Sequence, residues 1–310
     1  MFALRGIAVS LTFFVLLYCL LSALVAVGWH SLRLLHISER TQVAMLFGLR
    51  VLPLTAALIF MLGFVVPSFQ LLEPRSIDED TGAAPLALGI GALLLLFFGC
   101  WRVIAALMAT SRVVARWSQG ARTLAGAQTV TVLSTRDVPP LTLVGVCKPI
   151  VLVSESTVAL LSQDELRVAL EHERSHWLSR DNLKKLVFRF CPFPGMRKLE
   201  RAWSQSAELA ADDAAVSNLD DAVALASALI KLSRLVPVDP LLVCTVGFVT
   251  GSIRVRVSRL LAWEEVGKSR RPGTRPWYLL APAVVALLFV FATYGPALAL
   301  THEATEWLVR

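Results

Sequence analysis

Two histidines in the segment ALEHERSHWLSRDN (residues 169–182) have a spacing that suits the binding of one metal ion. His172 and His176 are four residues apart, and Glu173 directly follows the first. On an α-helix, residues i and i+4 share a face, so both imidazoles can reach the same ion. Glu173 lies about 100° further round the helix, where it can approach the ion without binding it. The motif therefore predicts Zn²⁺ as cofactor and Glu173 as the general base of a hydrolase.

A catalytic zinc ion of this kind needs a third protein ligand, and residues 206–218 (SAELAADDAAVSN) supply the candidates. Glu208 lies 32 residues after His176, on what should be a separate helix, and is the predicted ligand. Asp212 follows on the same helical face, where it could accept the distal ring N–H of a ligand histidine. Asp213 is the rival for that role. The alternative is a solvated acidic patch on a helix surface.

A further carboxylate, Asp181, stands five residues after His176. It could brace the site or cap a local turn. A surface salt bridge with Arg180 or Lys184 is an equally good interpretation of the sequence. For the histidine pair itself, the alternative is two core side chains that satisfy only their own hydrogen bonds.

The rest of the chain is unusually apolar. Of its 310 residues, 56% are hydrophobic, and the mean hydropathy is +0.65, whereas soluble domains are about 45–50% apolar. Four nearly charge-free stretches are long enough for the ~20-residue helix that crosses a bilayer. They predict spans at about residues 6–29, 51–72, 83–104 and 277–300. The alternative is that one or two of them are buried helices of a large soluble core.

The charged residues predict an orientation for these spans. The segment from residue 102 to 275 holds 24 of the 30 Lys and Arg residues and 16 of the 23 Asp and Glu residues. Positive charge favours the cytoplasmic side, so this segment and the loop 33–50 should face the cytoplasm, with both termini and the acidic loop 73–80 outside. The basic surplus indicates attraction to the lipid bilayer rather than direct binding of nucleic acid. The five scattered cysteines are expected to be reduced.

The predicted organisation is three transmembrane helices in residues 1–110, a zinc metallopeptidase domain in 111–275, and a fourth transmembrane helix with a short tail in 276–310. Within the domain, residues 129–154 alternate β-branched and polar residues and predict strands. Residues 162–165 (SQDE) predict a capping box that opens the motif helix, which must end or bend by Pro192. Two more helices are expected over 196–216 and 221–235, and a final one near 255–264.

Taken together, the spans, the segment GVCKPIVLVS, the HExxH segment and the element AELAADDA resemble the BlaR/MecR-type integral-membrane zinc metallopeptidases. The resemblance implies an α-helical membrane protein with four transmembrane helices and a cytoplasmic α+β, gluzincin-like metallopeptidase domain inserted between the third and fourth spans. It also implies zinc ligands at His172, His176 and Glu208, a general base at Glu173, and the plasma membrane of a bacterium as location.

The better-known members of that family sense β-lactams through an extracellular penicillin-binding domain and signal so that a cytoplasmic repressor is cleaved. In this sequence only about ten residues follow the fourth predicted span, so direct β-lactam sensing is not assigned. The expected function is a membrane-embedded zinc endopeptidase whose substrate is a protein or peptide, such as a transcriptional repressor. Alternatives are a non-catalytic receptor or scaffold and a membrane quality-control zinc peptidase. The oligomeric state is not predicted.

Overall fold

The chain is mostly helical and forms two compact units, which are described separately below. The computed structural model describes residues 2–30, 37–74, 82–117, 122–123, 131–135, 139–146, 149–235, 246–247, 253–263 and 280–309. The first unit comprises Met1–His30, Val51–Phe98 and Arg271–Arg310. The second comprises Ser31–Arg50 and Gly99–Arg270.

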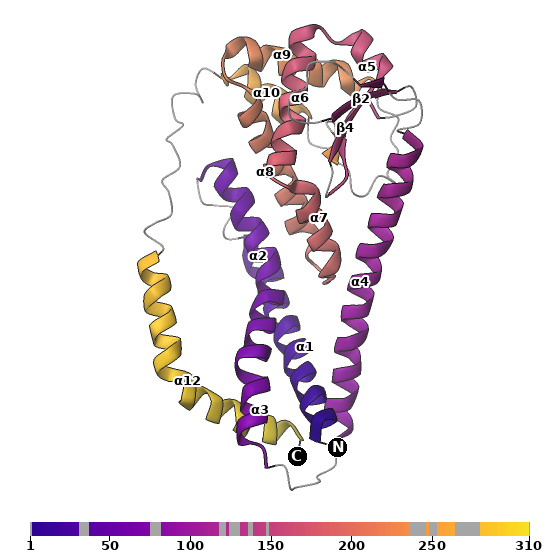
Figure 1. Cartoon of the computed structure of the whole chain (residues 1–310). Helices are drawn as coiled ribbons and strands as arrows, with labels where there is room; N and C mark the ends of the chain where they lie inside the picture. The colour runs from indigo at the N-terminus through magenta and orange to yellow at the C-terminus, as the bar shows by residue number, and fades with distance from the viewer. Residues whose placement is uncertain are drawn as a thin grey trace. The chain divides into compact units, whose positions relative to one another are not determined.

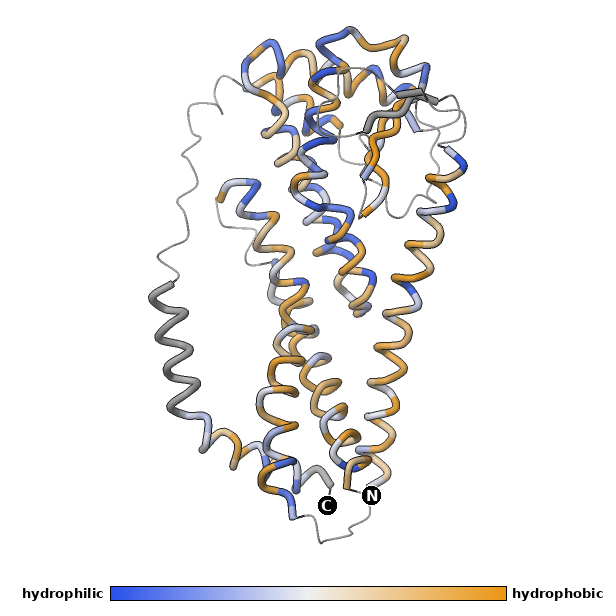
Figure 2. The backbone as a smooth tube through the Cα atoms, in the orientation of Figure 1, coloured by the Kyte–Doolittle hydropathy of each residue, from blue (hydrophilic) through white to orange (hydrophobic). Residues whose placement is uncertain are grey.

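Three helical runs are long and apolar enough to cross a membrane, and they coincide with the first three predicted spans. They are α1 (Phe2–Gly28), a continuous run of α2 (Glu39–Phe60), the π-helical segment η2 (Met61–Val65) and α3 (Val66–Leu72), and α4 (Ala83–Trp117). Figure 2 shows hydrophobic residues along most of these helices. Large apolar side chains such as Leu20, Ile59 and Phe97 are more than half exposed, as expected for surfaces that face lipid.

The fourth predicted span falls on α12 (Leu280–Val309), a 30-residue helix that contains Pro296. In the first unit, α12 packs against α3 and η2. The hydroxyl of Tyr294 donates a 2.8 Å hydrogen bond to the backbone oxygen of Gly63 in η2. The sequence expectation that α12 crosses the membrane remains a prediction.

The expectation that residues 33–50 form a loop is wrong for its second half, because α2 already begins at Glu39. Ser38 precedes the helix, and its hydroxyl accepts a 3.3 Å hydrogen bond from the backbone N–H of Thr41. The charged Arg50 does not end the helix, since it is buried in the second unit and pairs with Glu200 at 2.9 Å. A search for charge-free runs ends at such a residue, but a helix continues through a charge that has a partner.

The second unit contains a five-stranded sheet in the order β1-β2-β4-β3-β5. The three longer strands, β2 (Thr131–Thr135), β3 (Leu141–Val144) and β4 (Ile150–Ser154), confirm the strands predicted over 129–154. β2 and β4 are parallel, whereas β3 is antiparallel to β4 and also to β5 (Val246–Gly247). The remaining edge strand is β1 (Arg122–Thr123). All four residues of β3 are buried, so this strand lies inside the unit.

Six helices described by the structure complete the second unit. Figure 1 shows one of them, α6, near the sheet. They are α5 (Glu155–Leu160), α6 (Gln163–Leu178), α7 (Asp181–Phe190), α8 (Arg197–Ala215), α9 (Leu219–Ser233) and α10 (Ile253–Leu261). α6 packs against α8, α9 and β3, and α10 packs against α9. Their shared core includes Leu143 and Val151 from the sheet and Val168, Leu225 and Leu229 from the helices. The helices expected over 196–216, 221–235 and 255–264 are confirmed as α8, α9 and α10, and the motif helix ends before Pro192 as predicted, at Leu178. The separate helix α7 that follows it was not predicted.

The cysteines that the structure describes, Cys19, Cys100 and Cys191, are free thiols, in line with the expected reduced state. Cys147 and Cys244 lie outside the described residues.

Candidate metal centre

The helix α6 presents the two motif histidines toward the interior of the second unit. Its predicted capping box is present: the hydroxyl of Ser162 accepts the N–H of Glu165, and the Glu165 carboxylate accepts the N–H of Ser162 at 2.8 Å. The cap fixes where the helix starts and therefore which face turns inward. His172 and His176 are at most 1% exposed. Their Nε2 atoms lie 3.1 Å apart, and the ring planes are nearly perpendicular, at 82°.

Glu208, on α8, completes a group of three potential ligands. Its Oε2 lies 3.6 Å from Nε2 of His172, and its Oε1 lies 3.7 Å from Nε2 of His176. The buried alanines beside it, Ala207 and Ala211, are small enough for α8 to approach α6 closely. Zinc bonds of 2.0–2.1 Å in a tetrahedral site place neighbouring donors about 3.3 Å apart. Separations of 3.1 to 3.7 Å therefore suit three donors to one ion. We call these three residues the His172 cluster.

Asp212 contacts the far side of the first histidine. Its Oδ1 lies 3.0 Å from Nδ1 of His172, so Nε2 of that ring is left to face the centre of the cluster. Asp213, the rival for this place, turns elsewhere and pairs with Arg259 at 2.9 Å. Two adjacent residues of α8 thus place one carboxylate inside the site and one at the margin of the unit. Neither acid belongs to a merely solvated patch.

Asp181 contacts the second histidine in the same way. Its Oδ2 lies 2.7 Å from Nδ1 of His176, and its Oδ1 forms an ion pair with Nζ of Lys184 at 3.1 Å. The break between α6 and α7 makes this possible, because Arg180 adopts a left-handed conformation (φ 54°) and α7 then begins at Asp181. The alternative of a purely surface salt bridge is wrong, since Asp181 is only 3% exposed. Its ion pair with Lys184 accompanies the contact with His176.

Arg256, on α10, is a site residue that the sequence interpretation missed. It is 2% exposed, and its Nε and Nη2 donate to the two oxygens of Asp212 at 2.7 and 2.6 Å. Its Nη1 donates to Oε2 of Glu208 at 3.0 Å. The available signal was a pair of basic residues three apart, Arg256 and Arg259, on a short helix downstream of two adjacent acids. Of these two adjacent acids, Asp212 pairs with Arg256 and Asp213 pairs with Arg259.

Glu173 is fully buried beside the cluster. Among the residues that the structure describes, neither carboxylate oxygen makes a hydrogen bond of good geometry, although the backbone of Leu143 is close enough to lower the pKa of Glu173. Burial raises the pKa of Glu173, and the nearby charges of His176 and His172 offset that rise only in part. A buried carboxylate with so few hydrogen-bond donors is costly, and such groups are concentrated at functional sites. Its charge interacts with both histidines, so Glu173 lies near the cluster, and its role as a general base remains a prediction.

The charges around the cluster favour a bound cation. Burial lowers the pKa of His172, but its contacts with Asp212 and Glu208 outweigh this effect and raise that pKa to about 9. Burial raises the pKa of Asp212, yet its contacts with His172 and Arg256 bring it down to about 2. The carboxylates thus stabilise positive charge on the imidazoles, which a metal ion could supply in place of protons.

The number of charged groups leads to the same conclusion. The site holds four carboxylates against two cationic side chains, which with neutral imidazoles leaves two negative charges. The carboxylates are Glu173, Asp181, Glu208 and Asp212, and the cations are Lys184 and Arg256. A divalent ion would balance this charge, and two imidazoles with one carboxylate are a donor set that suits zinc. The buried carboxylate of Glu173, which interacts with both histidines, would also suit a site that acts on a bound water.

A cavity of about 480 Å³ opens beside the second histidine. It is lined by residues from the end of β3 and from the α6–α7 junction, including His176 and Asp181. The side-chain amide of Asn182 donates to the backbone oxygens of Leu143 (3.2 Å) and Gly145 (2.9 Å), which fixes the end of β3 against α7. The cavity therefore has the end of β3 on one side and His176 with the α6–α7 junction on another.

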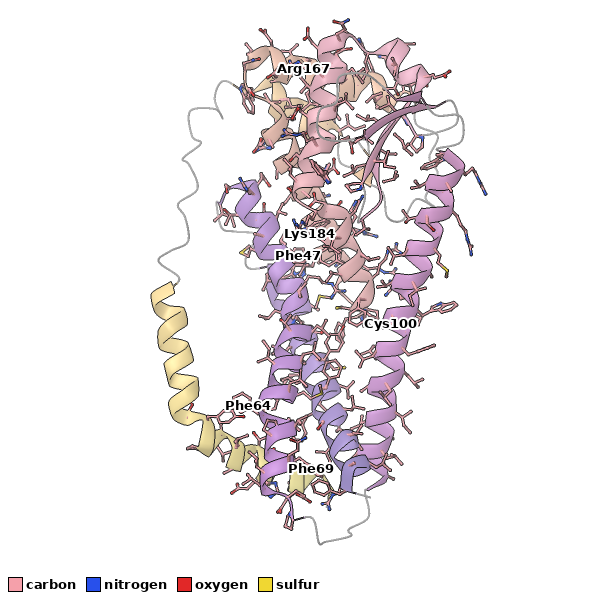
Figure 3. The ribbon with its side chains drawn as sticks, viewed as in Figure 1. Phe47, Phe64, Phe69, Cys100, Arg167 and Lys184 are labelled. Carbon is pink, nitrogen blue, oxygen red and sulfur yellow. The ribbon has the colours of Figure 1, made fainter. Side chains whose placement is uncertain are left out.

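On its other side, α7 is held by aromatic residues. The Lys184 ammonium, whose partner Asp181 contacts His176, lies 5.8 Å from the ring centroid of Phe47 and 5.9 Å from that of Trp203. Figure 3 shows Lys184 beside Phe47. These cation–π contacts restrict the Lys184 side chain that anchors Asp181.

No protein-family model matches this chain, and no curated protein matches it.

Proposed function

We propose that this protein is a membrane-embedded, zinc-dependent endopeptidase. The observation that carries the proposal is the convergence of three donors from two helices, 3.1 to 3.7 Å apart, with a carboxylate behind each imidazole. His172, His176 and Glu208 would hold the ion. When bound there, zinc would supply a Lewis acid that polarises a peptide carbonyl and lowers the pKa of water.

The protein's own residues would handle the proton. Glu173 accepts a proton from the attacking water at a carboxylate oxygen, and the water oxygen bonds to the peptide carbonyl carbon. Glu173 then passes the proton to the amide nitrogen, and the C–N bond breaks to release the amine. Among the described residues no hydrogen bond of good geometry occupies the Glu173 oxygens, which leaves them available for this transfer. Asp212 and Asp181 orient the two imidazoles and hold the ring protons at Nδ1.

The surroundings of β3 suit an extended peptide. The strand packs against α6, and the cavity next to His176 is bounded by the end of the same strand. An extended chain can use main-chain hydrogen bonds along a sheet, as in β-augmentation. In the described part of the sheet, β3 is paired on both sides, with β4 and β5. A peptide would therefore bind in the cavity next to this strand or take the place of β5.

The substrate class and location that we propose follow from the resemblance and the charge distribution. The motif segments resemble BlaR/MecR-type peptidases, which supports a cytoplasmic or membrane-proximal protein, such as a transcriptional repressor, as substrate. The basic surplus of residues 102–275 supports a cytoplasmic peptidase unit, and three apolar helices support a multi-pass membrane protein.

The test compares two glutamates of α6 in the full chain purified in detergent. Glu173→Gln should retain zinc but lose cleavage of the chain itself and of an unstructured fluorogenic peptide library by about 10²–10⁴-fold, because the general base is gone. Zinc per chain is measured by elemental mass spectrometry, and cleavage by fluorescence and by intact-mass analysis.

Glu171→Gln is the matched control, since Glu171 is half-exposed and pairs only with Arg174 among the described residues. It should leave both zinc content and cleavage unchanged. Equal cleavage by the wild type and Glu173→Gln would refute the proposed chemistry. Zinc-loaded wild type that cleaves nothing would favour a scaffold.

A further inference from the structure

A second group of potential metal ligands lies at one end of the first unit, outside the site described above. It consists of Glu73, His302 and Glu306, and we call it the His302 cluster. Nδ1 of His302 lies 3.7 Å from Oε2 of Glu73, and its Nε2 lies 3.5 Å from Oε1 of Glu306. One donor atom from each of the three residues can be chosen so that all lie within 4.8 Å of one another.

Three separate elements bring these residues together. Glu73 is the C-cap residue of α3, and its N–H donates to the backbone oxygen of Phe69. His302 and Glu306 are one turn apart on α12, which packs against α3. Arg5 of α1 is buried and contacts Glu73 at 3.2 Å. Figure 1 shows the start of α1 and the ends of α3 and α12 at the same end of this unit.

The imidazole is not satisfied by these neighbours. Nδ1 of His302 is inaccessible to solvent and has no hydrogen-bond partner among the residues that the structure describes. Its 3.7 Å separation from Glu73 is too long for a hydrogen bond. A buried polar atom in this position is expected to have a partner. A metal ion between the imidazole and the carboxylate would supply one.

The charges allow a cation. Glu73 and Glu306 contribute two negative charges and Arg5 one positive charge, so a neutral imidazole leaves one negative charge uncompensated. Arg5 holds the Glu73 carboxylate in place, as the outer partners of metal-ligating carboxylates do.

We propose that the His302 cluster is a second metal site, which takes a divalent transition-metal ion such as zinc and ties α12 to α3. One imidazole with two carboxylates is a zinc-type donor set, whereas Ca²⁺ prefers oxygen ligands only. Binding draws the donors from at most 4.8 Å apart to about 3.3 Å. The side chain of Glu306 is 43% exposed, so it can change rotamer to make that movement. The proposal does not depend on peptidase activity.

The experiment counts zinc in the full chain. Detergent-purified protein is stripped with a chelator and titrated with Zn²⁺ by calorimetry, and bound zinc is measured after gel filtration. The wild type should bind about two ions per chain. His302→Ala should bind about one, with its tightest site intact, and His172→Ala should lose the other.

Glu303→Gln is the matched control, because Glu303 neighbours His302 on α12 but is exposed. It should bind as much zinc as the wild type. The retained His172-dependent site shows that His302→Ala is folded. If His302→Ala and wild type bind equal amounts of zinc, or if Ca²⁺ displaces zinc from this site, the proposal is overturned. If His172→Ala binds as much zinc as the wild type while His302→Ala binds one ion fewer, the His302 site stands and the proposed peptidase centre is contradicted.

Thermal unfolding is a second test of whether a metal ion at the His302 cluster links α12 to α3. A ligand that binds only the folded state raises its stability in proportion to RT ln(1 + [L]/Kd). In a His172→Ala background, added zinc should raise the unfolding midpoint for Glu303→Gln but not for His302→Ala or Glu73→Gln. Equal shifts in all of these variants would contradict a metal held by this cluster.

Discussion

The His172 cluster and the His302 cluster use the same kinds of donor, yet they differ in how those donors are supported. The first has two imidazoles and a carboxylate that are at most 3% exposed, and an aspartate lies behind each imidazole. In the second, the His302 side chain is 17% exposed and that of Glu306 is 43% exposed. Arg5 contacts a carboxylate of this cluster rather than the imidazole. Burial and outer support, more than ligand type, distinguish the two.

This difference has a physical consequence for metal affinity. Hydrogen-bond partners behind a ligand fix its rotamer and tautomer before the ion arrives. The ligand side chains of the His172 cluster need little further ordering when the ion binds. In the His302 cluster, by contrast, the partly exposed side chain of Glu306 loses conformational freedom on binding. We expect tight binding at the first cluster and weaker, exchangeable binding at the second.

The largest expected effect comes from removing the carboxylate ligand of the first cluster. Glu208→Ala should weaken zinc binding there by more than the ~100-fold that loss of an outer partner can cost, and should abolish cleavage. It also leaves Arg256 with one carboxylate in place of two. Competition titration with a zinc-binding dye measures the affinity.

Asp213→Ala is the matched control, since Asp213 is on the same helix but pairs with Arg259 at the margin of the unit. It should retain both zinc and activity. Unchanged zinc affinity in Glu208→Ala would remove the distinction between the two clusters.

The next effect concerns Arg256, the buried cation that contacts both Glu208 and Asp212 beside the His172 cluster. Arg256→Met leaves Glu208 and Asp212 without their cationic partner, and breaking a buried ion pair in this way costs about 3–5 kcal/mol. Without zinc the second unit should unfold at a clearly lower denaturant concentration, and added zinc should recover part of the loss by supplying positive charge.

Arg259→Met provides the comparison, because Arg259 is about a quarter exposed and should cost little. Denaturant unfolding with and without zinc measures both variants. Equal destabilisation by the two substitutions would contradict the role assigned to Arg256.

A smaller effect is expected from the outer partner of the second histidine. Asp181→Asn keeps the shape but removes the charge that orients His176, and should lower zinc affinity about 10–100-fold. The same titration measures it, with the exposed Asp164→Asn as control. If Asp181→Asn binds zinc as tightly as the wild type, the support behind the imidazoles is not what sets the first cluster apart.

The smallest expected effect lies at the start of the motif helix and depends on pH. Burial raises the pKa of Glu165, but hydrogen bonds from Lys231 and Ser227 outweigh it, so that this pKa is lowered from 4.5. A lowered carboxyl pKa contributes stability that is present above about pH 4.5 and is lost as pH falls through the folded value. Glu165→Gln should therefore cost about 1–2 kcal/mol at pH 7 and progressively less in acid.

Thermal unfolding from pH 7 down to pH 3 checks this, with Glu171→Gln as the control on the same helix. A cost for Glu165→Gln that does not change with pH would mean that the carboxylate charge contributes nothing to the start of α6.

Local sequence patterns predicted much of the second unit. Ser162 and Glu165 fixed the start of α6, and the spacing of His172, His176 and Glu208 predicted which side chains would meet. These predictions succeeded because they depend on helical geometry over short distances, together with small residues that let two helices approach.

Partners distant in sequence were harder to predict. Arg256 contacts Asp212 from another helix, and no local pattern indicates which basic residue will fold back onto a given acid. Arg50 was assigned to a loop because it is charged, although its charge is matched by Glu200, far along the chain. The His302 cluster was missed for the same reason, since Glu73 and His302 come from opposite ends of the sequence.

Arg180, which adopts the left-handed conformation, sets how α7 is rotated relative to α6. An α-helix turns about 100° per residue, so inserting or deleting one residue between Leu178 and Asp181 would swing the Asp181 carboxylate away from His176. Every motif residue would still be present, yet one imidazole would lose its counterpart. In chains with this motif, the length of the linker after the second histidine is therefore as informative as the histidines themselves.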